Sequence, residues 1–168
     1  MTVHPSPDAP TSPARGLAQG SAGQQTVRSG LDVLQEHLTA GGGPRQPVER
    51  LLRMEVRSVV HGRAVVEMAP TADHLNGQGI LHGGMYATVL DSACAAACYT
   101  TVPDGTRIVS TDLSVKFLRS AAPDSGVLEC TAEVVNRGRR NVLLEARMTD
   151  QAGRLLAFAT CTIMVLQD

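Results

Sequence analysis

Hydrophobic and polar residues alternate along the second half of the chain. In the segment 127–136, Leu128 and Cys130 belong to one side of the expected strand, and Glu129 and Thr131 belong to the other. Because successive side chains of a strand face opposite sides, this pattern predicts an antiparallel sheet with one buried face. The same alternation, with an apolar second face in the last case, marks segments 106–118, 141–149 and 154–166. We therefore expect a four-strand meander whose last strand lies inside the sheet.

The segment before these strands predicts one long hydrophobic helix. Residues 83–101 are apolar and rich in Ala, and the small side chains at 93–98 would surround the helix axis. Such a helix has no polar face, so a sheet must wrap around it to bury it. Two shorter strands, 51–60 and 63–69, precede the helix, and an irregular Gly-rich stretch at 70–82 joins them to it. The order predicts an α+β fold, an antiparallel sheet wrapped around one long central helix.

The segment before residue 48 is expected to lie outside this domain. Residues 1–28 are rich in Pro, Ser, Gly and Gln and have almost no large apolar side chains, which predicts a disordered tail. Residues 29–47 are expected to form a short amphipathic helix at 30–39 and then a linker. The folded domain is expected to occupy residues 48–168.

Composition and charge narrow the classes of function. The net charge of −1 argues against non-specific binding of nucleic acid, which needs an excess of Lys and Arg. No apolar run suits a membrane helix, and the N-terminus lacks the apolar stretch of a signal peptide, so we expect a cytoplasmic protein. The cysteines lie in apolar segments without metal-ligand spacing, which favours reduced, buried thiols. They are Cys94, Cys98, Cys130 and Cys161.

The residues that could bind or activate a ligand lie at the start of the long helix. Gly83 and Gly84 stand where the loop becomes helix, and the first N–H groups of a helix have no partner within it. The helix dipole is positive there and glycine has no Cβ, so a polarised carbonyl or an oxyanion could reach the backbone. A helix start that merely packs closely against a neighbour would use the same two glycines.

Asp91 lies about two turns further along this helix, among apolar neighbours. A carboxylate in such surroundings is costly unless it is paired or partly hydrated, which makes Asp91 a candidate catalytic residue. The alternative is a cap for a second helix that starts at Ser92. His82 is more readily a structural histidine than a catalytic base, and a Cys94–His82 nucleophile is disfavoured because nothing nearby would lower the thiol pKa.

A family resemblance emerges when these residues are taken together. The chain resembles the PaaI-like acyl-CoA thioesterases of the hotdog fold in Asn76, Gly79, His82, Gly83, Gly84 and Asp91. The resemblance covers about residues 48–166, including the order of strands and helix, and excludes the tail. Some related thioesterases have Glu at the position of Asp91 and Thr at the position of Ala95, so this chain resembles the Asp branch.

The resemblance implies hydrolysis of an acyl- or aryl-CoA thioester, without a metal or a cofactor. The backbone N–H of Gly83 would polarise the thioester carbonyl, and Asn76 would hold the thioester or the attacking water. Asp91 would act as general base or nucleophile, facing Gly83 across a homodimer interface, and dimers of dimers are common in the family. Ser110 falls where some members place a water-positioning hydroxyl, although it could also be simply a small strand residue.

The substrate would contact further residues around this centre. We expect contacts from His82, Gly84, Met85, Arg137, Arg139 and Arg140. The three arginines lie in one hairpin turn, which is either an ordinary solvated turn or an anchor for the phosphates of CoA. Two rival functions are a non-catalytic acyl-CoA-binding hotdog module and a hotdog-fold hydratase. We expect no partnership with nucleic acid or with a membrane.

Overall fold

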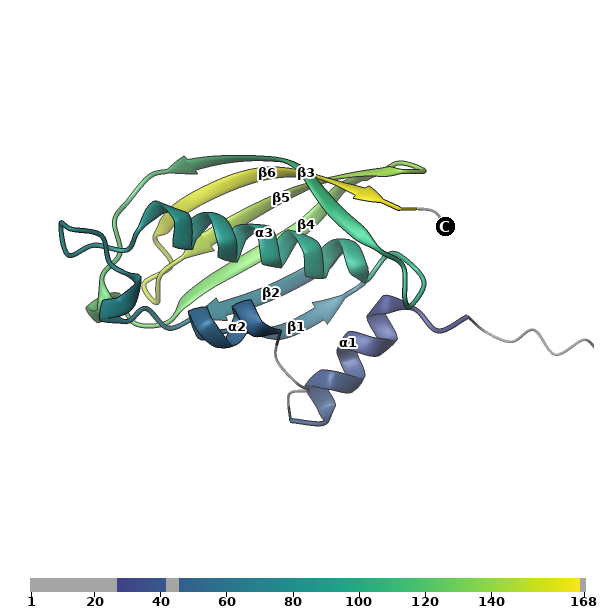
Figure 1. The fold of residues 1–168 in the computed structure, drawn as a ribbon, viewed down its shortest axis with the longest axis horizontal. Coiled ribbons are helices and arrows are strands. Elements are labelled where there is room, and N and C mark those ends of the chain that lie inside the picture. The colour runs from purple at the N-terminus through teal and green to yellow at the C-terminus, as the bar shows by residue number, and fades with distance from the viewer. Residues whose placement is uncertain (1–26, 42–45, 167–168) are drawn as a thin grey trace, which may run out of the picture.

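The computed structural model describes residues 27–41 and 46–166 of the chain. Most of the predicted tail at 1–28, and residues 42–45 of the predicted linker, therefore lie outside the described residues. The elements, shown in Figure 1, are α1 (Gly30–Thr39), α2 (Pro47–Leu52), β1 (Met54–Val60), β2 (Arg63–Met68), η1 (Ala72–His74), α3 (Gly83–Tyr99), β3 (Ile108–Phe117), η2 (Pro123–Ser125), β4 (Leu128–Arg137), β5 (Asn141–Thr149) and β6 (Leu155–Val165).

Six antiparallel strands form one sheet in the order β1-β2-β4-β5-β6-β3. Figure 1 shows this sheet curving around α3, which lies across its inner face. Val89 and Leu90 of the helix and Leu144 and Ile163 of the sheet are fully buried where the two layers meet. The arrangement confirms the predicted α+β fold with a sheet wrapped around one long helix.

The predicted meander of four consecutive strands is wrong for its first member. Strand β3 pairs with β6 at the edge of the sheet, with Ile108 opposite Val165 and Phe117 opposite Ala157, so only β4, β5 and β6 follow one another. Alternation along a strand reports its buried face but not its neighbour. The connection from β3 to β4, which includes η2, is long enough for β4 to take its place between β2 and β5 rather than beside β3. The interior position predicted for the last strand is confirmed.

The predicted strand at 51–60 is also partly wrong, because its first residues belong to α2. Pro47 occupies the first turn of this helix, where a missing N–H and a fixed φ are tolerated. The Glu49 side chain accepts the Gln46 N–H at 2.8 Å and secures the start of the helix. Arg53 then adopts a left-handed conformation (φ 50°), which ends the helix and lets β1 begin.

The predicted helix at 30–39 is present as α1. It begins with a capping box, in which the Asp32 N–H donates to Ser29 Oγ at 3.2 Å and the Ser29 N–H donates to Asp32 Oδ2 at 2.9 Å. The Gly30 N–H donates to the Val102 carbonyl at 2.9 Å, which joins α1 to the loop after α3. Figure 1 shows α1 beside the C-terminal end of α3, away from the start of that helix.

The core contains small and flexible side chains in place of aromatic ones. Ala93 and Ala97 are fully buried on α3, which lets the strands approach the helix backbone closely, and Met54, Met68 and Met148 fill the remaining space. All four cysteines are free and buried, as the sequence predicts. Within the described part of the chain, no helix has both the length and the hydrophobicity that crossing a membrane requires.

Candidate active site

The first turn of α3 leaves one backbone donor open. His82 is the N-cap, and its Nδ1 accepts the Gly84 N–H at 2.9 Å. The His82 carbonyl accepts the Met85 N–H at 2.9 Å, so the next two donors of the turn have partners. No described residue accepts the Gly83 N–H. This donor is therefore free to bind a ligand at the positive end of the helix dipole.

His82 is expected to stabilise the helix through this cap. Replacing His82 by Ala removes the acceptor of the Gly84 N–H and should lower the free energy of unfolding by about 1 kcal/mol. Replacing it by Asn keeps an acceptor of a preferred N-cap type, so this matched variant should stay within a few tenths of a kcal/mol of the wild type. Urea unfolding followed by circular dichroism measures both, and equal losses would contradict the capping role.

A cavity of about 330 Å³ lies beside the start of α3 and contains Gly83. Asn76 also lines it, so the structure brings together two residues that the sequence predicts for the site. The Asn76 side-chain oxygen accepts the Gln78 N–H at 2.9 Å, in a turn that Gly79 completes with a φ of 75°. The amide nitrogen of Asn76 thus remains as the donor that a ligand could use. The other lining residues are Ile80, Leu81, Tyr86, Phe117, Leu118, Arg119 and Ser120.

An aromatic pair forms part of the wall of this cavity. The rings of Tyr86 and Phe117 meet edge to face, with centroids 5.8 Å apart, and Phe117 remains 57% exposed. The Tyr86 hydroxyl donates to the Arg119 carbonyl at 3.3 Å, and burial raises the pKa of this tyrosine. The Phe117 ring lies 3.4 Å from the point where a Cβ on Gly83 would stand. Gly83 and Phe117 thus line the same cavity, where a bound ligand could contact both.

The sequence does not indicate Phe117 as a site residue. It does offer Arg119, at the end of a strand, beside the three hairpin arginines as a possible anchor for the phosphates of CoA. Arg119 donates to the Leu155 carbonyl at 2.7 Å, and this contact holds its side chain at the start of β6. The pairing of β3 with β6, and the hydrogen bond from the Leu81 N–H to the Ala121 carbonyl at 2.7 Å, hold this segment beside the start of α3. The one available signal was that Phe117 is one of only two phenylalanines and stands at the end of a strand.

Asp91 lies further along α3 and is partly buried. Ser110 Oγ donates to its Oδ1 at 2.7 Å, and the Cys161 thiol lies 3.9 Å from the same oxygen. The carboxylate is thus both paired and in contact with solvent, which removes much of the cost of its apolar surroundings. Helix α3 runs unbroken from Gly83 to Tyr99, so the alternative that Asp91 caps a second helix is wrong.

Gly83 and Asp91 do not share a cavity within one chain. Asp91 is eight positions after Gly83 in the helix, which corresponds to a rise of about 12 Å along the axis. The cavity that contains Gly83 and Asn76 does not include Asp91, which instead faces Ser110 on β3. One chain therefore presents two half-sites, a donor half at the start of α3 and a carboxylate half near its middle.

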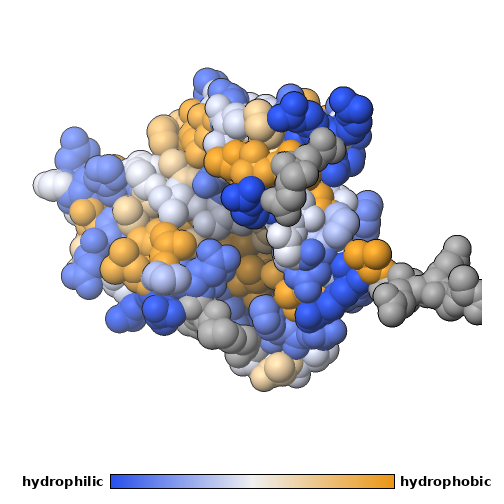
Figure 2. Space-filling model, turned by 45° about the vertical axis from the view of Figure 1, so that its right-hand side comes forward, coloured by the Kyte–Doolittle hydropathy of each residue, from blue (hydrophilic) through white to orange (hydrophobic). Residues whose placement is uncertain are grey.

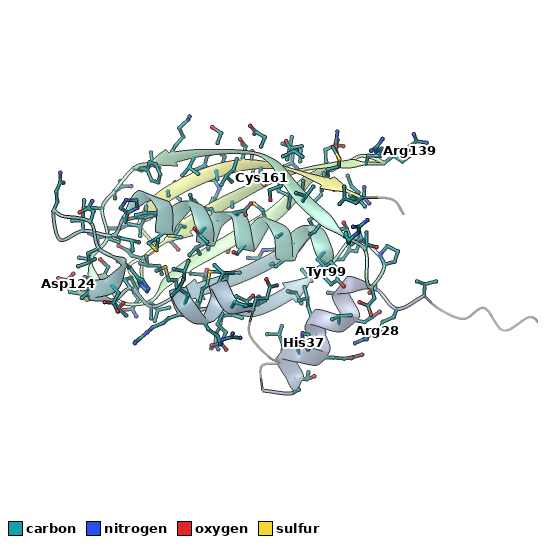
Figure 3. The ribbon with its side chains drawn as sticks, in the orientation of Figure 1. Arg28, His37, Tyr99, Asp124, Arg139 and Cys161 are labelled. Carbon is teal, nitrogen blue, oxygen red and sulfur yellow. The ribbon has the colours of Figure 1, made fainter. Side chains whose placement is uncertain are left out.

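The predicted arginine anchor lies away from the donor half-site. Arg137 lines a different cavity, of about 440 Å³, together with Thr101 from the segment after α3. Figure 3 shows Arg139 at the end of the molecule opposite Asp124, and Asp124 belongs to η2 near the start of α3. Arg140 lies in the same hairpin, where its carbonyl accepts the Val165 N–H at 2.7 Å. Within one chain, the arginine hairpin is thus remote from Gly83.

The surroundings of Cys94 and Cys98 make these two thiols poor nucleophiles, and the described residues group no metal ligands. Burial raises the pKa of the Cys98 thiol to about 11. The pKa of the Cys94 thiol is also raised, by its hydrogen bond with Cys161, by burial and by the charge of the nearby Asp91. A protonated, buried thiol is a poor nucleophile. Among residues 27–41 and 46–166, no three His, Cys, Asp or Glu side chains are grouped so that they could hold a metal ion.

Sequence comparison relates the chain to proteins that act on thioesters. The family model described as the thioesterase superfamily matches residues 78–157. The chain is 31% identical to the acyl-coenzyme A thioesterase PaaI of Escherichia coli, over 64% of this chain and 74% of that protein. It is 25% identical to the 1,4-dihydroxy-2-naphthoyl-CoA hydrolase of Listeria monocytogenes, over 70% of this chain and 94% of the relative.

Structural comparison leads to the same group of proteins. The solved structure of the Escherichia coli PaaI protein superposes with a TM-score of 0.69 at 25% identity, covering 80% of this chain and 93% of that structure. The shared fold includes the curved antiparallel sheet and its single long helix. The hotdog architecture expected from the sequence is therefore confirmed.

Proposed function

The chain belongs to the thioesterase superfamily, and on that premise we propose that it hydrolyses an acyl- or aryl-CoA thioester to the free acid and CoA. The observation that carries the proposal is the open N–H of Gly83 inside a cavity at the start of α3. A donor at the positive end of a helix suits the oxygen of a thioester carbonyl, which gains negative charge when it is attacked. Asn76 is the second candidate donor for this thioester or for the attacking water.

Asp91 supplies the base or the nucleophile of the proposed reaction. As a general base, its carboxylate takes a proton from water while the water oxygen bonds to the carbonyl carbon. The tetrahedral intermediate then expels CoA as a thiolate, which is protonated on release. As a nucleophile, the carboxylate itself attacks and expels the thiolate, and water hydrolyses the resulting anhydride. Ser110 fits either route because it fixes one carboxylate oxygen.

Two chains are needed to unite the donor and the carboxylate. One side of β3 pairs with β6, whereas its other side faces no strand among the described residues, and such an edge is a template for pairing with another chain. We infer a two-fold dimer in which β3 pairs with the partner's β3 and the two α3 helices lie side by side. Figure 2 shows exposed hydrophobic residues around a hollow in one face, which association would cover.

The same dimer gives a role to the arginine hairpin. In a two-fold dimer with antiparallel helices, the middle and end of α3 in one chain lie beside the start of α3 in the partner. Arg137, Arg139 and Arg140 would then approach the partner's donor half-site from the side of Asp91, where their guanidinium groups suit the phosphates of CoA. His82, Gly84 and Met85 would line the entrance. A further pairing of dimers and a cytoplasmic location stay predictions.

Release of CoA from a panel of thioesters tests the proposed function. Short, medium, long and aryl acyl-CoA substrates are incubated with the protein, and the free thiol is followed with a thiol reagent. We expect turnover of at least one acyl class, which would identify the substrate. Tight binding of an acyl-CoA in calorimetry without thiol release would favour a non-catalytic acyl-CoA-binding module. An added enoyl-CoA that loses its conjugated absorbance without thiol release would favour a hydratase.

A further inference from the structure

We propose that Cys161 is a positioning residue, which together with Ser110 fixes Oδ1 of Asp91 so that Oδ2 is the oxygen that reacts. This inference rests on the proposed function and adds a residue from β6, far along the chain from the signature around the start of α3. Ser110 Oγ and Cys161 Sγ lie 2.7 and 3.9 Å from Oδ1, and both are possible donors to it. No described residue donates to Oδ2.

The sheet register places these two donors on adjacent strands. Ser110 lies at a bulge of β3, where the register shifts between Ser110 and Asp112, and a bulge re-aims a side chain. Cys161 stands opposite Leu113 of β3 and Leu144 of β5, with its side chain on the buried face toward α3. One donor therefore approaches Asp91 from the exposed edge of the sheet, and the other approaches from the core.

The buried Cys161 thiol is a weak hydrogen-bond donor, but its position lets it shield and orient the Asp91 carboxylate. The thiol is fully buried, so it excludes water from the core side of the carboxylate. Ser110, in contrast, is exposed and leaves the outer side accessible. A carboxylate with one oxygen held between two neighbours has a fixed orientation, and fixed orientation lowers the entropic part of the barrier. A water molecule or a thioester carbon can then approach only the remaining oxygen.

Because Cys161 can lose its proton, we expect kcat to depend on pH through the groups around this thiol. The thiol contacts Asp91, and Cys94 and Cys98 of α3 and Ser110 and Asp112 of β3 also influence its ionisation. The hydrogen bond from Cys94 lowers the pKa of Cys161 below its usual value, whereas burial and the charge of Asp91 act in the opposite direction. At alkaline pH a thiolate here could no longer donate and would repel the carboxylate. We therefore expect kcat to fall as rising pH removes the proton of Cys161, and this alkaline fall should begin at a lower pH than the titration of an ordinary cysteine thiol.

Steady-state kinetics of matched cysteine variants test this inference on the best acyl-CoA of the panel. Replacing Cys161 by Val fills the space without a donor and should lower kcat about 2- to 10-fold, as expected for one modest hydrogen bond, with little change in KM. It should also abolish the alkaline fall in kcat. Cys161→Ser retains a donor and should keep kcat near the wild-type value at neutral pH. Cys94→Val should move the alkaline fall to higher pH.

A buried thiol on β4 provides the control. Cys130→Val makes the same change in a fully buried position, and it should leave kcat and the pH profile unchanged. The inference is overturned if Cys161→Val keeps wild-type kcat and the alkaline fall, or if Cys130→Val lowers kcat equally. Turnover by the wild type is measured first, so failure of the proposed function is distinguished from failure of the role of Cys161.

Discussion

Replacing Asp91 by Asn is expected to lower kcat for acyl-CoA hydrolysis by about 10²–10⁴-fold, the usual contribution of a general base. The amide has the same shape and still accepts the hydrogen bond from Ser110, but it can neither take a proton from water nor attack a thioester. Because Asp91 is only partly buried and faces no cation in the described residues, the fold should be preserved. KM should change little.

Asp124→Asn is a suitable control for this variant. Asp124 is an exposed carboxylate on η2, so its replacement alters the net charge equally without touching the proposed site. The measurement is CoA release under substrate saturation, together with the thermal unfolding curve of each variant. Wild-type kcat in a folded Asp91→Asn protein would remove this carboxylate from the mechanism.

Replacing Gly83 by Pro is expected to lower kcat by about 10²–10³-fold, the typical cost of losing one oxyanion donor. Proline removes the N–H in question and is tolerated at the first position of a helix. The residue before it must be extended, and His82 already has φ −64° and ψ 137°. The substitution should therefore delete the donor while leaving α3 in place.

Gly83→Ala separates the lost donor from the added atoms. Its Cβ would meet the Phe117 ring at 3.4 Å, an ordinary van der Waals contact, and its N–H is retained. We expect Gly83→Ala to keep much more activity than Gly83→Pro, with any change falling mainly on KM. If the two variants lose kcat equally, crowding of the cavity rather than the N–H explains the effect.

The sequence predicted each strand that depends on local alternation. The range 141–149 coincides with β5, and the long helix differs from its prediction only at its C-terminal end. The sequence could not indicate which strand pairs with β3. The choice between β4 and β6 as its neighbour depends on the path of the chain around α3. Helix α2 was missed although Pro47 and Glu49 are start signals, because its few apolar residues also fit a strand.

The site residues that the sequence indicates are those close together in the chain, and the residues it misses come from distant strands. Gly83 and Asn76 stand close together in the chain, and the cavity contains both. Ser110 was placed from family resemblance, and it contacts Asp91 directly, which the sequence pattern alone could not show. Phe117 and Cys161 reach the half-sites through strand register, so no local spacing indicates them.

The central claim is that each active site takes its N–H donor from one chain and its carboxylate from another. Its most direct test is co-expression of Asp91→Asn with Gly83→Pro, each nearly inactive alone. In randomly formed two-fold dimers, about one quarter of all sites would combine an intact Gly83 with an intact Asp91, so we expect about one quarter of wild-type kcat. No gain over the separate variants, despite mixed dimers detected by native mass spectrometry, would contradict the claim.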